Sequence, residues 1–219
     1  MLGFDETILR QPKRDLVLKI LIALIGDALI GFGISLNTCA GLGHNPTAAF
    51  MDGIRKLFDI DFGLTFNFVN LIMFFVVFIF ARQYVNIGTA INAISLGYFV
   101  NLAEKFYTHF TFPETLAFKG IAAFVACTLL FFGIATFSSV EIGFDPWTGF
   151  VMLLKDKLRF NYRLCLLVIN VMLSLFGLFL GGRVGGTTLI VIFFGGPIIQ
   201  EFENFIKKSI LNKFNFKNN

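Results

Sequence analysis

Apolar runs of about 20 residues recur along the whole chain, and no other feature limits the possible folds as strongly. A helix needs about 20 apolar residues to cross the roughly 30 Å hydrocarbon layer of a bilayer. The 219 residues are 56% hydrophobic and 15% charged, and they include 31 phenylalanines. A water-soluble protein of this length needs more charge to cover its surface. The sequence therefore predicts an integral membrane protein whose excess apolar side chains face lipid.

Six membrane spans are predicted, all of them helical, because a helix satisfies its own backbone polar groups within the bilayer. The runs are solidly apolar and do not alternate, which argues against a β-barrel. The third and sixth runs are short or interrupted by glycine. The expected spans are approximately Leu16–Thr38, Gly63–Ala81, Ile87–Ala103, Leu116–Phe137, Leu164–Gly181 and Thr187–Ile199.

The Lys and Arg residues lie in short clusters between the apolar runs, and their distribution predicts an orientation. With a cytoplasmic N-terminus, the outside segments carry only Arg55, Lys56, Lys105, Lys119 and Arg183, and the other 13 of the 18 basic residues lie inside. Cytoplasmic loops of membrane proteins carry such an excess of positive charge. Both termini are therefore expected in the cytoplasm. The net charge of +4 then reflects topology, and nucleic acid is not an expected partner.

The chain also repeats itself at an offset of 100 residues. Among the matches are residues that lipid does not require: Gly33, Gly43, Pro46 and Asn70 correspond to Gly133, Gly143, Pro146 and Asn170. Each half holds three predicted spans, and an odd number places the second half upside down relative to the first. This predicts the inverted-repeat plan of many transporters. The expected units are a cytoplasmic segment 1–15, a first repeat 16–106, a loop 107–115, a second repeat 116–206 and a cytoplasmic basic tail 207–219.

A polar break and a helix start follow the first span of each half. Asn45 and Asp145 are good N-caps, and Pro46 and Pro146 suit the first helical position. Gly43 and Gly143, two residues before the caps, allow a tight turn. The sequence therefore predicts short helices over Pro46–Leu57 and Pro146–Leu158 that are too short to span. They either re-enter the membrane or lie in its interface.

These breaks combine with a G-T-x-x-N-x-x-x-x-G segment that begins at Gly88. Its residues are Gly88, Thr89, Asn92 and Gly97, and those of the breaks are Gly43, Pro46, Gly143, Asp145, Pro146 and Trp147. The combination resembles the bacterial YczE/YitT-type membrane protein family over about residues 16–205. The first half departs from the pattern, with His44-Asn45-Pro46-Thr47 where Asp-Pro-Trp is favoured. The resemblance implies a six-span protein of the bacterial plasma membrane and implies no particular chemistry.

Polar residues between the two halves are the candidates for a solute site. If the short helices enter the membrane, their N-termini approach each other, and their free N–H groups favour an anionic or carboxylate-bearing solute. Asp145 offsets part of this field, and His44 is either charged or neutral, so a small polar or zwitterionic solute also fits. In the alternative interpretation, Asn45 and Asp145 only cap interfacial helices and Trp147 belongs to the aromatic belt.

Asp27 is a carboxylate well inside a predicted span. A charge there costs about 2.5–3.5 kcal/mol on insertion scales, which makes it a functional candidate. It either carries a coupling proton or is a neutral carboxyl bonded to a facing Asn or Ser. Asn70 and Asn170 either bond between helices or line a pore. The predicted substrate-binding residues are Asp27, His44, Asn45, Asn70, Asp145, Trp147 and Asn170, supported structurally by Gly43, Pro46, Gly143 and Pro146.

Transport of a small solute is the function that the sequence favours. The chain has no HExxH, GxSxG or nucleotide-binding loop, two histidines and no CxxC spacing, so no enzyme activity, metal or cofactor is expected. The expected partners are the lipid bilayer, a small-molecule solute, and a second copy of the chain or an accessory subunit. The alternative function is that of a non-transporting accessory or regulatory protein that acts through a protein partner.

Overall fold

The computed structural model describes residues 12–209, and within this range it contains α-helices, one 3₁₀ turn and no strand. The all-α fold expected from the sequence is therefore confirmed. The helices are α2 (Lys13–Ala40), α3 (Pro46–Phe58), α4 (Phe62–Phe80), α5 (Ile87–Tyr107), α6 (Leu116–Ser139), α7 (Pro146–Leu158), α8 (Tyr162–Phe179) and α9 (Gly186–Ser209), with the 3₁₀ turn η1 at Arg82–Tyr84.

Five of the described helices are long and apolar enough to cross a membrane, namely α2, α4, α6, α8 and α9. Helix α5 has 21 residues and covers the third predicted span, but it carries polar side chains along its length, including Asn92, Ser95 and Asn101. The chain is thus a multi-pass helical membrane protein. The position of α5 relative to the bilayer remains a prediction.

Several helix ends differ from the expected spans. Helix α2 begins at Lys13, so the last residues of the expected segment 1–15 are already helical. Helix α9 continues past Ile199 to Ser209 although it contains Pro197. A proline removes one backbone hydrogen bond, and a membrane helix tolerates that loss where neighbouring groups compensate. Residues 1–11 and 210–219, which hold most of both expected terminal segments, lie outside the described residues.

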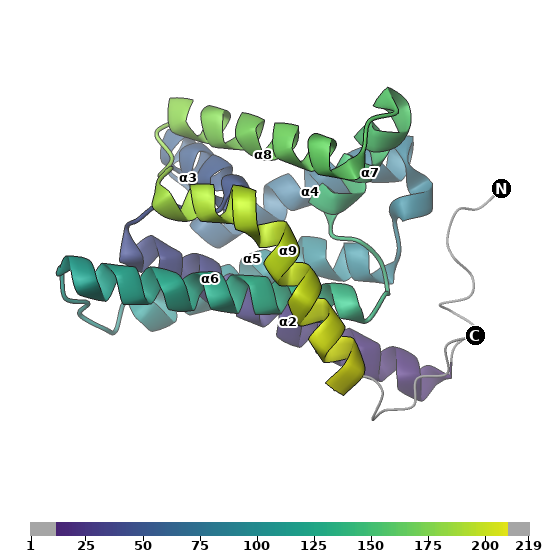
Figure 1. The fold of residues 1–219 in the computed structure, drawn as a ribbon, viewed down its shortest axis with the longest axis horizontal. Helices are drawn as coiled ribbons and strands as arrows, with labels where there is room; N and C mark the ends of the chain where they lie inside the picture. The colour runs from purple at the N-terminus through teal and green to yellow at the C-terminus, as the bar shows by residue number, and fades with distance from the viewer. Residues whose placement is uncertain (1–11, 210–219) are drawn as a thin grey trace.

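The helices form two layers that are crossed by α9 (Figure 1). Helices α2, α5 and α6 lie in one layer, and α3, α4, α7 and α8 lie in the other. Helix α9 starts beside the end of α8 and then runs obliquely across to α6. Helices α4 and α5 stay packed along their length, whereas α8 and α9 diverge from their shared connection.

Close backbone contact between α2 and α6 holds the centre of the first layer. A Cβ on Gly33 would lie 2.8 Å from the amide nitrogen of Leu130, and a Cβ on Gly133 would lie 2.7 Å from that of Ile30. Both glycines are therefore required for this approach. The residues of one contact lie 100 positions from their counterparts in the other contact. Helices α2 and α6 therefore pack through corresponding positions of the repeat.

Helices α3 and α7 form as the capping motifs predict. The side chain of Asn45 accepts a hydrogen bond from the Ala48 amide at 2.7 Å, and that of Asp145 accepts from two amides of α7 at 3.1 Å each. The two short helices meet inside the molecule, where the rings of Phe50 and Trp147 lie 6.4 Å apart, edge to face. Sequence and structure agree that these helices begin at Pro46 and Pro146.

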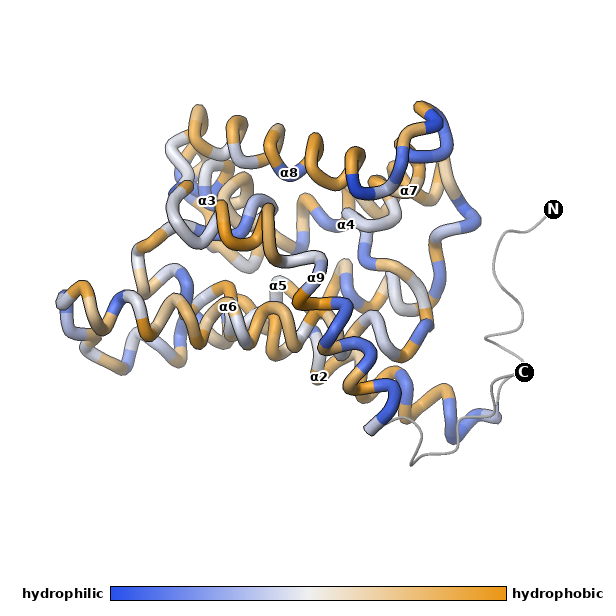
Figure 2. The backbone as a smooth tube through the Cα atoms, viewed as in Figure 1, coloured by the Kyte–Doolittle hydropathy of each residue, from blue (hydrophilic) through white to orange (hydrophobic). Residues whose placement is uncertain are grey.

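The outer surface of the long helices is apolar. Phe179, Leu116 and Phe124 are 84%, 78% and 74% exposed, and many other large apolar side chains are more than half exposed. Hydrophilic residues gather instead near helix ends and connections, as at the α7–α8 turn and the end of α9 (Figure 2). Such a surface suits contact with lipid along the helices and with water at their ends.

Candidate functional site

Asp27 lies buried between α2 and α5. Its carboxylate accepts hydrogen bonds from Asn92 Nδ2 at 2.7 Å and from Ser95 Oγ at 2.5 Å, and its exposed fraction is 0%. These are the contacts expected of a carboxyl bonded to a facing Asn or Ser. Asp145 is close enough to act on Asp27 electrostatically. Neither carboxylate forms an ion pair with any residue in the range 12–209.

Trp147 and Asn70 join the second half of the chain to the first. The indole Nε1 donates a hydrogen bond of 2.9 Å to Asn70 Oδ1, and Asn70 is 1% exposed. Asn170, its counterpart in the repeat, stays apart: within the described part of the chain its side chain makes no hydrogen bond, and its backbone oxygen accepts from Ser174 Oγ at 2.8 Å. The structure therefore brings together only one of the two predicted asparagines with Trp147.

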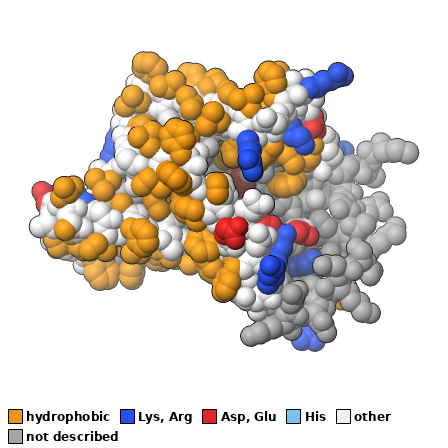
Figure 3. Space-filling view, in the orientation of Figure 1, with side chains coloured by type: hydrophobic (Ala, Val, Ile, Leu, Met, Phe, Trp, Pro, Cys, Tyr) orange, Lys and Arg blue, Asp and Glu red, His pale blue; other side chains and the backbone are white. Residues whose placement is uncertain are grey.

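The first turn of α8 completes this polar region. The hydroxyl of Tyr162 lies close to the side chains of Thr148 and Asp145. Asp145 itself is half-buried at the start of α7. Figure 3 shows a shaded hollow on this face, between α8 and α9, with acidic atoms visible inside it. We call Asp27, Asn70, Asp145, Trp147 and Tyr162 the central polar site.

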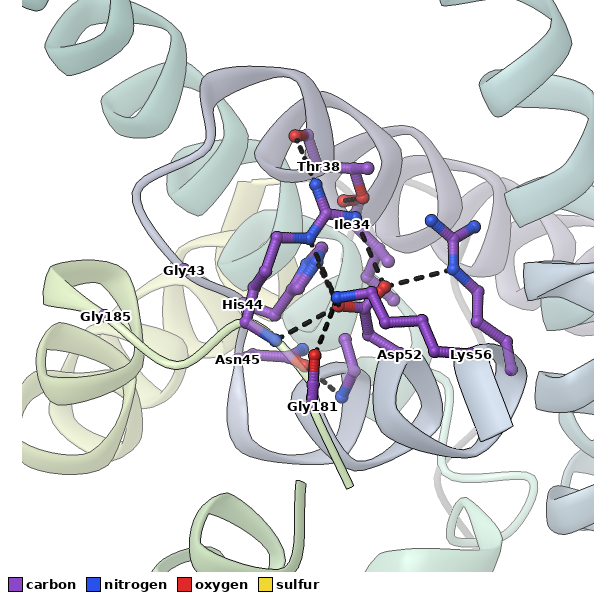
Figure 4. A network of polar contacts seen from close by, with 12 residues as sticks. Ile34, Thr38, Gly43, His44, Asn45, Asp52, Lys56, Gly181 and Gly185 are labelled. Atoms are coloured by element: carbon purple, nitrogen blue, oxygen red, sulfur yellow. Dashed lines mark hydrogen bonds and ion pairs between the residues drawn. The ribbon is translucent and has the colours of Figure 1, made fainter. Parts of the chain in front are cut away.

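His44 and Asn45 lie in a different polar cluster, which surrounds Asp52 (Figure 4). Asp52 is 0% exposed and receives three cationic side chains: Arg183 Nε at 3.1 Å, Arg55 Nε at 3.0 Å and Lys56 Nζ at 2.9 Å. Arg183 also donates from its backbone amide at 3.1 Å and from Nη2 at 3.2 Å. We call five of these residues the Asp52 cluster: His44, Asp52, Arg55, Lys56 and Arg183. Asn45 is not included.

The charges in the Asp52 cluster set its protonation. Burial alone would raise the pKa of Asp52, but the hydrogen bonds from Arg183 and Lys56 outweigh it and hold that pKa well below its ordinary range. A carboxylate with several cationic donors thus stays ionised although it is buried. Arg55 and Lys56 are basic residues in a segment expected outside, where few positive charges are expected. The cluster explains their presence, because both neutralise Asp52. Arg55 also pairs with Glu104 at 2.8 Å.

Sequence reasoning missed Asp52. The signal was present in part, because residues three and four apart on a helix share a face, and Arg55 and Lys56 follow Asp52 at those spacings. The partner Arg183 lies 131 positions away in the α8–α9 connection, and no local pattern points to it.

The His44 side chain is buried in this cluster and makes no hydrogen bond. Its side chain is 1% exposed, its ring lies 5.7 Å from that of Phe62, and its Nε2 lies 3.8 Å from Asp52 Oδ2. Neither ring nitrogen has a partner. Burial, reinforced by the charge of Arg183, lowers the pKa of His44 to about 3. This direction favours the neutral imidazole of the two states that the sequence left open.

Backbone contacts fasten the α2–α3 break to the start of α9. His44 donates its amide hydrogen to Arg183 O at 3.0 Å, and Thr188 Oγ1 donates to His44 O at 2.5 Å. Thr187 Oγ1 bonds to Gly43 O, and a Cβ on Gly43 would overlap the backbone of Gly185. Gly43 has φ of +102°, so it serves both the predicted turn and this contact.

The corresponding junction in the other half is looser. The Gly88 amide donates to Ile142 O at 2.9 Å, as the Thr187 amide does to Leu42 O at 3.3 Å. The side-chain contact there is one exposed hydrogen bond of 2.5 Å, from the Tyr84 hydroxyl in η1 to Asp156 in α7. The structure is thus fastened more firmly beside α3 than beside α7.

Comparison with known proteins identifies the family. Residues 17–204 match the group described as "Family of unknown function (DUF6198)", and the chain belongs to it. An uncharacterized membrane protein of Bacillus subtilis, YczE, is 23% identical over 194 residues, which cover 86% of each chain. The expected resemblance to YczE-type proteins is therefore confirmed.

Two further relatives have similar coverage. An uncharacterized protein of Haemophilus influenzae is 24% identical over 187 residues, covering 85% of this chain and 84% of its own. The uncharacterized protein YyaS of Bacillus subtilis is 20% identical over 189 residues, covering 86% and 94%. No solved structure matches the chain significantly. These comparisons support a membrane protein and leave its activity to be argued from its site.

Proposed function

We propose that this member of the family is a transporter of the bacterial plasma membrane that moves a small polar solute between its two halves. The solute carries an ammonium group, and zwitterions are included. The observation that supports this most directly is the central polar site. There, Asp27 and Asp145 are close enough to interact electrostatically, and neither forms an ion pair within residues 12–209.

Transport in this form requires two halves of opposite orientation, and paired contacts support that arrangement. Gly33 against Leu130 matches Gly133 against Ile30, and the Gly88–Ile142 bond matches the Thr187–Leu42 bond. We take α5 as the sixth span, which places residues 16–106 and 116–206 upside down relative to each other with both termini in the cytoplasm. Helices α3 and α7 then enter from opposite faces as re-entrant helices.

The chemistry of the central polar site favours a cationic group. The sequence alone favoured an anionic or zwitterionic solute, because helix N-termini attract anions. In the structure, the carboxylate of Asp145 already accepts from the Trp147 and Thr148 amides, so these amides are not free for a second anion. An ammonium group supplies the missing countercharge for Asp27 and Asp145, and aromatic faces such as that of Trp147 attract cations.

Flux measurements in proteoliposomes test this proposal. A panel of labelled amines, amino acids and carboxylic acids identifies the solute class, and Asp27→Asn and Asp145→Asn are then compared with the parent protein. Asparagine keeps the size of Asp27 and the capping ability of Asp145, so charge is the main change. Asp59→Asn is the matched control, because Asp59 is an exposed carboxylate that ends α3 in a left-handed conformation that Asn also tolerates.

The proposal expects amines or amino acids to be carried by the parent and the control and not by the two variants. Normal flux through both variants would show that the site is assigned wrongly. Flux of carboxylic acids alone would overturn the solute class. Absence of flux for every solute, together with a protein that co-purifies in defined proportion, would instead establish the accessory role.

A further inference from the structure

Asp27, Ser95 and the backbone of Ile91 form a chain of contacts between oxygen atoms. Ser95 Oγ lies 2.5 Å from Asp27 Oδ2 and 2.8 Å from the backbone oxygen of Ile91, one turn earlier in α5. Each contact joins two oxygens at hydrogen-bond distance, so each needs one hydrogen between its atoms. The Ser95 hydroxyl carries one hydrogen, and a carbonyl oxygen carries none. The second hydrogen therefore has to come from the carboxyl of Asp27.

A proton on Asp27 gives every polar atom of this chain a partner. The Ser95 hydroxyl donates to Ile91 O, which is a common acceptor for a serine inside a helix, and it accepts from the protonated Oδ2 of Asp27. The other carboxyl oxygen, Oδ1, accepts from Asn92 Nδ2 at 2.7 Å. In this assignment the Asp27–Ser95 hydrogen bond runs from the carboxyl to the hydroxyl. Without the proton, two oxygens would face each other with no hydrogen between them.

The charges around Asp27 agree with a neutral carboxyl. The neighbouring turns of α2 hold Ala23 and Gly31, α5 offers two uncharged side chains, and α6 carries no charged residue after Lys119, near its start. Asp145 of α7 acts on Asp27 electrostatically and is itself acidic. Asp27 has no ion pair among residues 12–209. A proton on Asp27 therefore leaves no uncompensated charge buried at this position.

The short contact between Asp27 and Ser95 also excludes a metal ion between their oxygens. A hydrogen fits between oxygens 2.5 Å apart, whereas even Mg²⁺ binds oxygen at about 2 Å, and two oxygens bound to one ion lie further apart than this. The second half has no equivalent of the three polar side chains, because the repeat places Cys127, Val191 and Phe194 at their positions. The protein therefore has one such proton-binding position.

We propose that Asp27 holds a proton in the solute-free protein and that the ammonium group of the solute replaces it, so that solute and proton are exchanged one for one. As the solute binds, the Oδ2–H bond breaks, the proton passes to the solution from which the solute came, and an ammonium N–H donates to the carboxylate. Release of the solute on the other side lets Asp27 take a proton from that solution. One positive charge replaces another, so the net charge of the central polar site is the same in both states. This inference rests on the proposed transport function and adds its coupling to protons.

Infrared difference spectra test the proton without any solute. The full chain is reconstituted in lipid near neutral pH, and the spectrum of Asp27→Asn is subtracted from that of the parent. The proposal expects the carbonyl stretching band of a protonated carboxyl in this difference. The same subtraction with Asp59→Asn should show no such band, because the Asp59 carboxylate is exposed. Absence of the band from the Asp27→Asn difference would overturn the proton on Asp27, independently of transport.

Ser95→Ala provides a second readout if Asp27→Asn folds poorly. Alanine favours the helix and removes the hydroxyl that accepts from Asp27, so the carboxyl band should keep its intensity and shift to higher frequency. Thr128→Ala is the matched control, because the Thr128 hydroxyl is exposed and bonds to the Phe124 carbonyl within α6. A band that Ser95→Ala leaves unshifted would show that Asp27 does not donate to Ser95.

Proteoliposomes with a pH difference across the membrane test the exchange. Labelled lysine and labelled alanine are the first probes, followed by the amines of the flux panel, and potassium with valinomycin holds the membrane potential near zero. An interior one pH unit more acidic than the exterior should accumulate a carried probe roughly tenfold by one-for-one exchange. The parent and Asp59→Asn should show this accumulation, and Asp27→Asn should not. Protein-free liposomes correct for leakage of the probe.

The outcomes distinguish the coupling from the transport itself. Flux that only equalises the probe concentrations under either gradient would overturn the exchange and keep the transport proposal. Accumulation driven by acid outside would do the same, because proton and solute would then move together. Absence of flux for every member of the panel would remove transport and the exchange with it, while the infrared band would still establish the proton on Asp27.

Discussion

At the scale of single residues, the two halves differ at positions that the offset of 100 places in register. Asp27 corresponds to Cys127, and Asp52 corresponds to Met152. The repeat therefore gives both halves the same helices, while these two buried carboxylates occur in the first half only. Side chains that are present in one half only, and that are buried with charged neighbours, are where function is expected.

The Asn70–Trp147 bond is the residue contact whose energy can be measured most directly. Asn70→Ala removes a buried acceptor and leaves the indole N–H unpaired, so we expect the free energy of unfolding to fall by about 1 kcal/mol. Asn170→Ala is the matched control, because the Asn170 side chain makes no hydrogen bond within residues 12–209. Thermal unfolding in detergent checks both. Equal losses for the two variants would contradict a specific role for the bond.

His44 predicts a loss of stability in mild acid. The unfolded chain binds a proton on this histidine below about pH 6.5, whereas the folded protein does so only below about pH 3. Between these values the unfolded state binds more protons, so stability is greatest above about pH 6.5. It falls by up to about 1.4 kcal/mol per pH unit as the pH decreases.

Unfolding temperatures measured from about pH 8 to about pH 5 check this sign. His44→Gln should flatten the profile, and His109→Gln should leave it as it is, because His109 is exposed in the turn after α5. A His44→Gln profile as steep as that of the parent would assign the acid sensitivity to other groups.

At the scale of helices, the α4–α5 and α8–α9 pairs are equivalent in sequence position but packed differently. Gly63 lies against Gly97, and the Gly63 amide donates to Asn101 Oδ1 at 2.8 Å. The corresponding position in α8 is Arg163, which is exposed, and Gly196, the counterpart of Gly97, has open space around it. The α4–α5 pair is thus closely packed through glycines, whereas α8 and α9 diverge.

Substitution of matched glycines tests this difference between helix pairs. In Gly97→Ala the new Cβ would overlap the backbone oxygen of Gly63, and overpacking of this kind costs about 1–3 kcal/mol. Gly196, its partner in the repeat, has open space around it, so Gly196→Ala should be neutral or stabilising by up to about 1 kcal/mol. Thermal unfolding in detergent distinguishes them, and equal stability of the two variants would contradict the packing.

At the scale of the whole molecule, the sequence predicted the positions of the helices well and the contacts between distant residues poorly. Spans and capped short helices depend on local patterns, such as Asn45-Pro46, and these were found. The ends of α2 and α9 were missed because polar residues continue a helix beyond the apolar run. The Arg183–Asp52 pair and the central polar site depend on folding across more than 70 residues, and no local pattern encodes them.

The proposed inverted orientation of the halves makes a prediction about sidedness that the whole fold must satisfy. In a background with Cys39, Cys127 and Cys165 replaced, single cysteines are introduced at Asp59, after α3, and at Lys157, near the end of α7; both positions are exposed. If α3 and α7 enter from opposite faces as proposed, an impermeant maleimide added to intact cells should label Asp59→Cys and spare Lys157→Cys until the cells are opened.

Glu114→Cys, in the exposed turn between α5 and α6, provides the reference for the outer face. It should follow Asp59→Cys if α4 and α5 each cross the membrane, in opposite directions. If Asp59→Cys and Glu114→Cys fall on opposite faces, α5 does not span, and the count of five apolar helices is the number of crossings. The second half would then share the orientation of the first. The solute path between inverted halves would lose its structural basis.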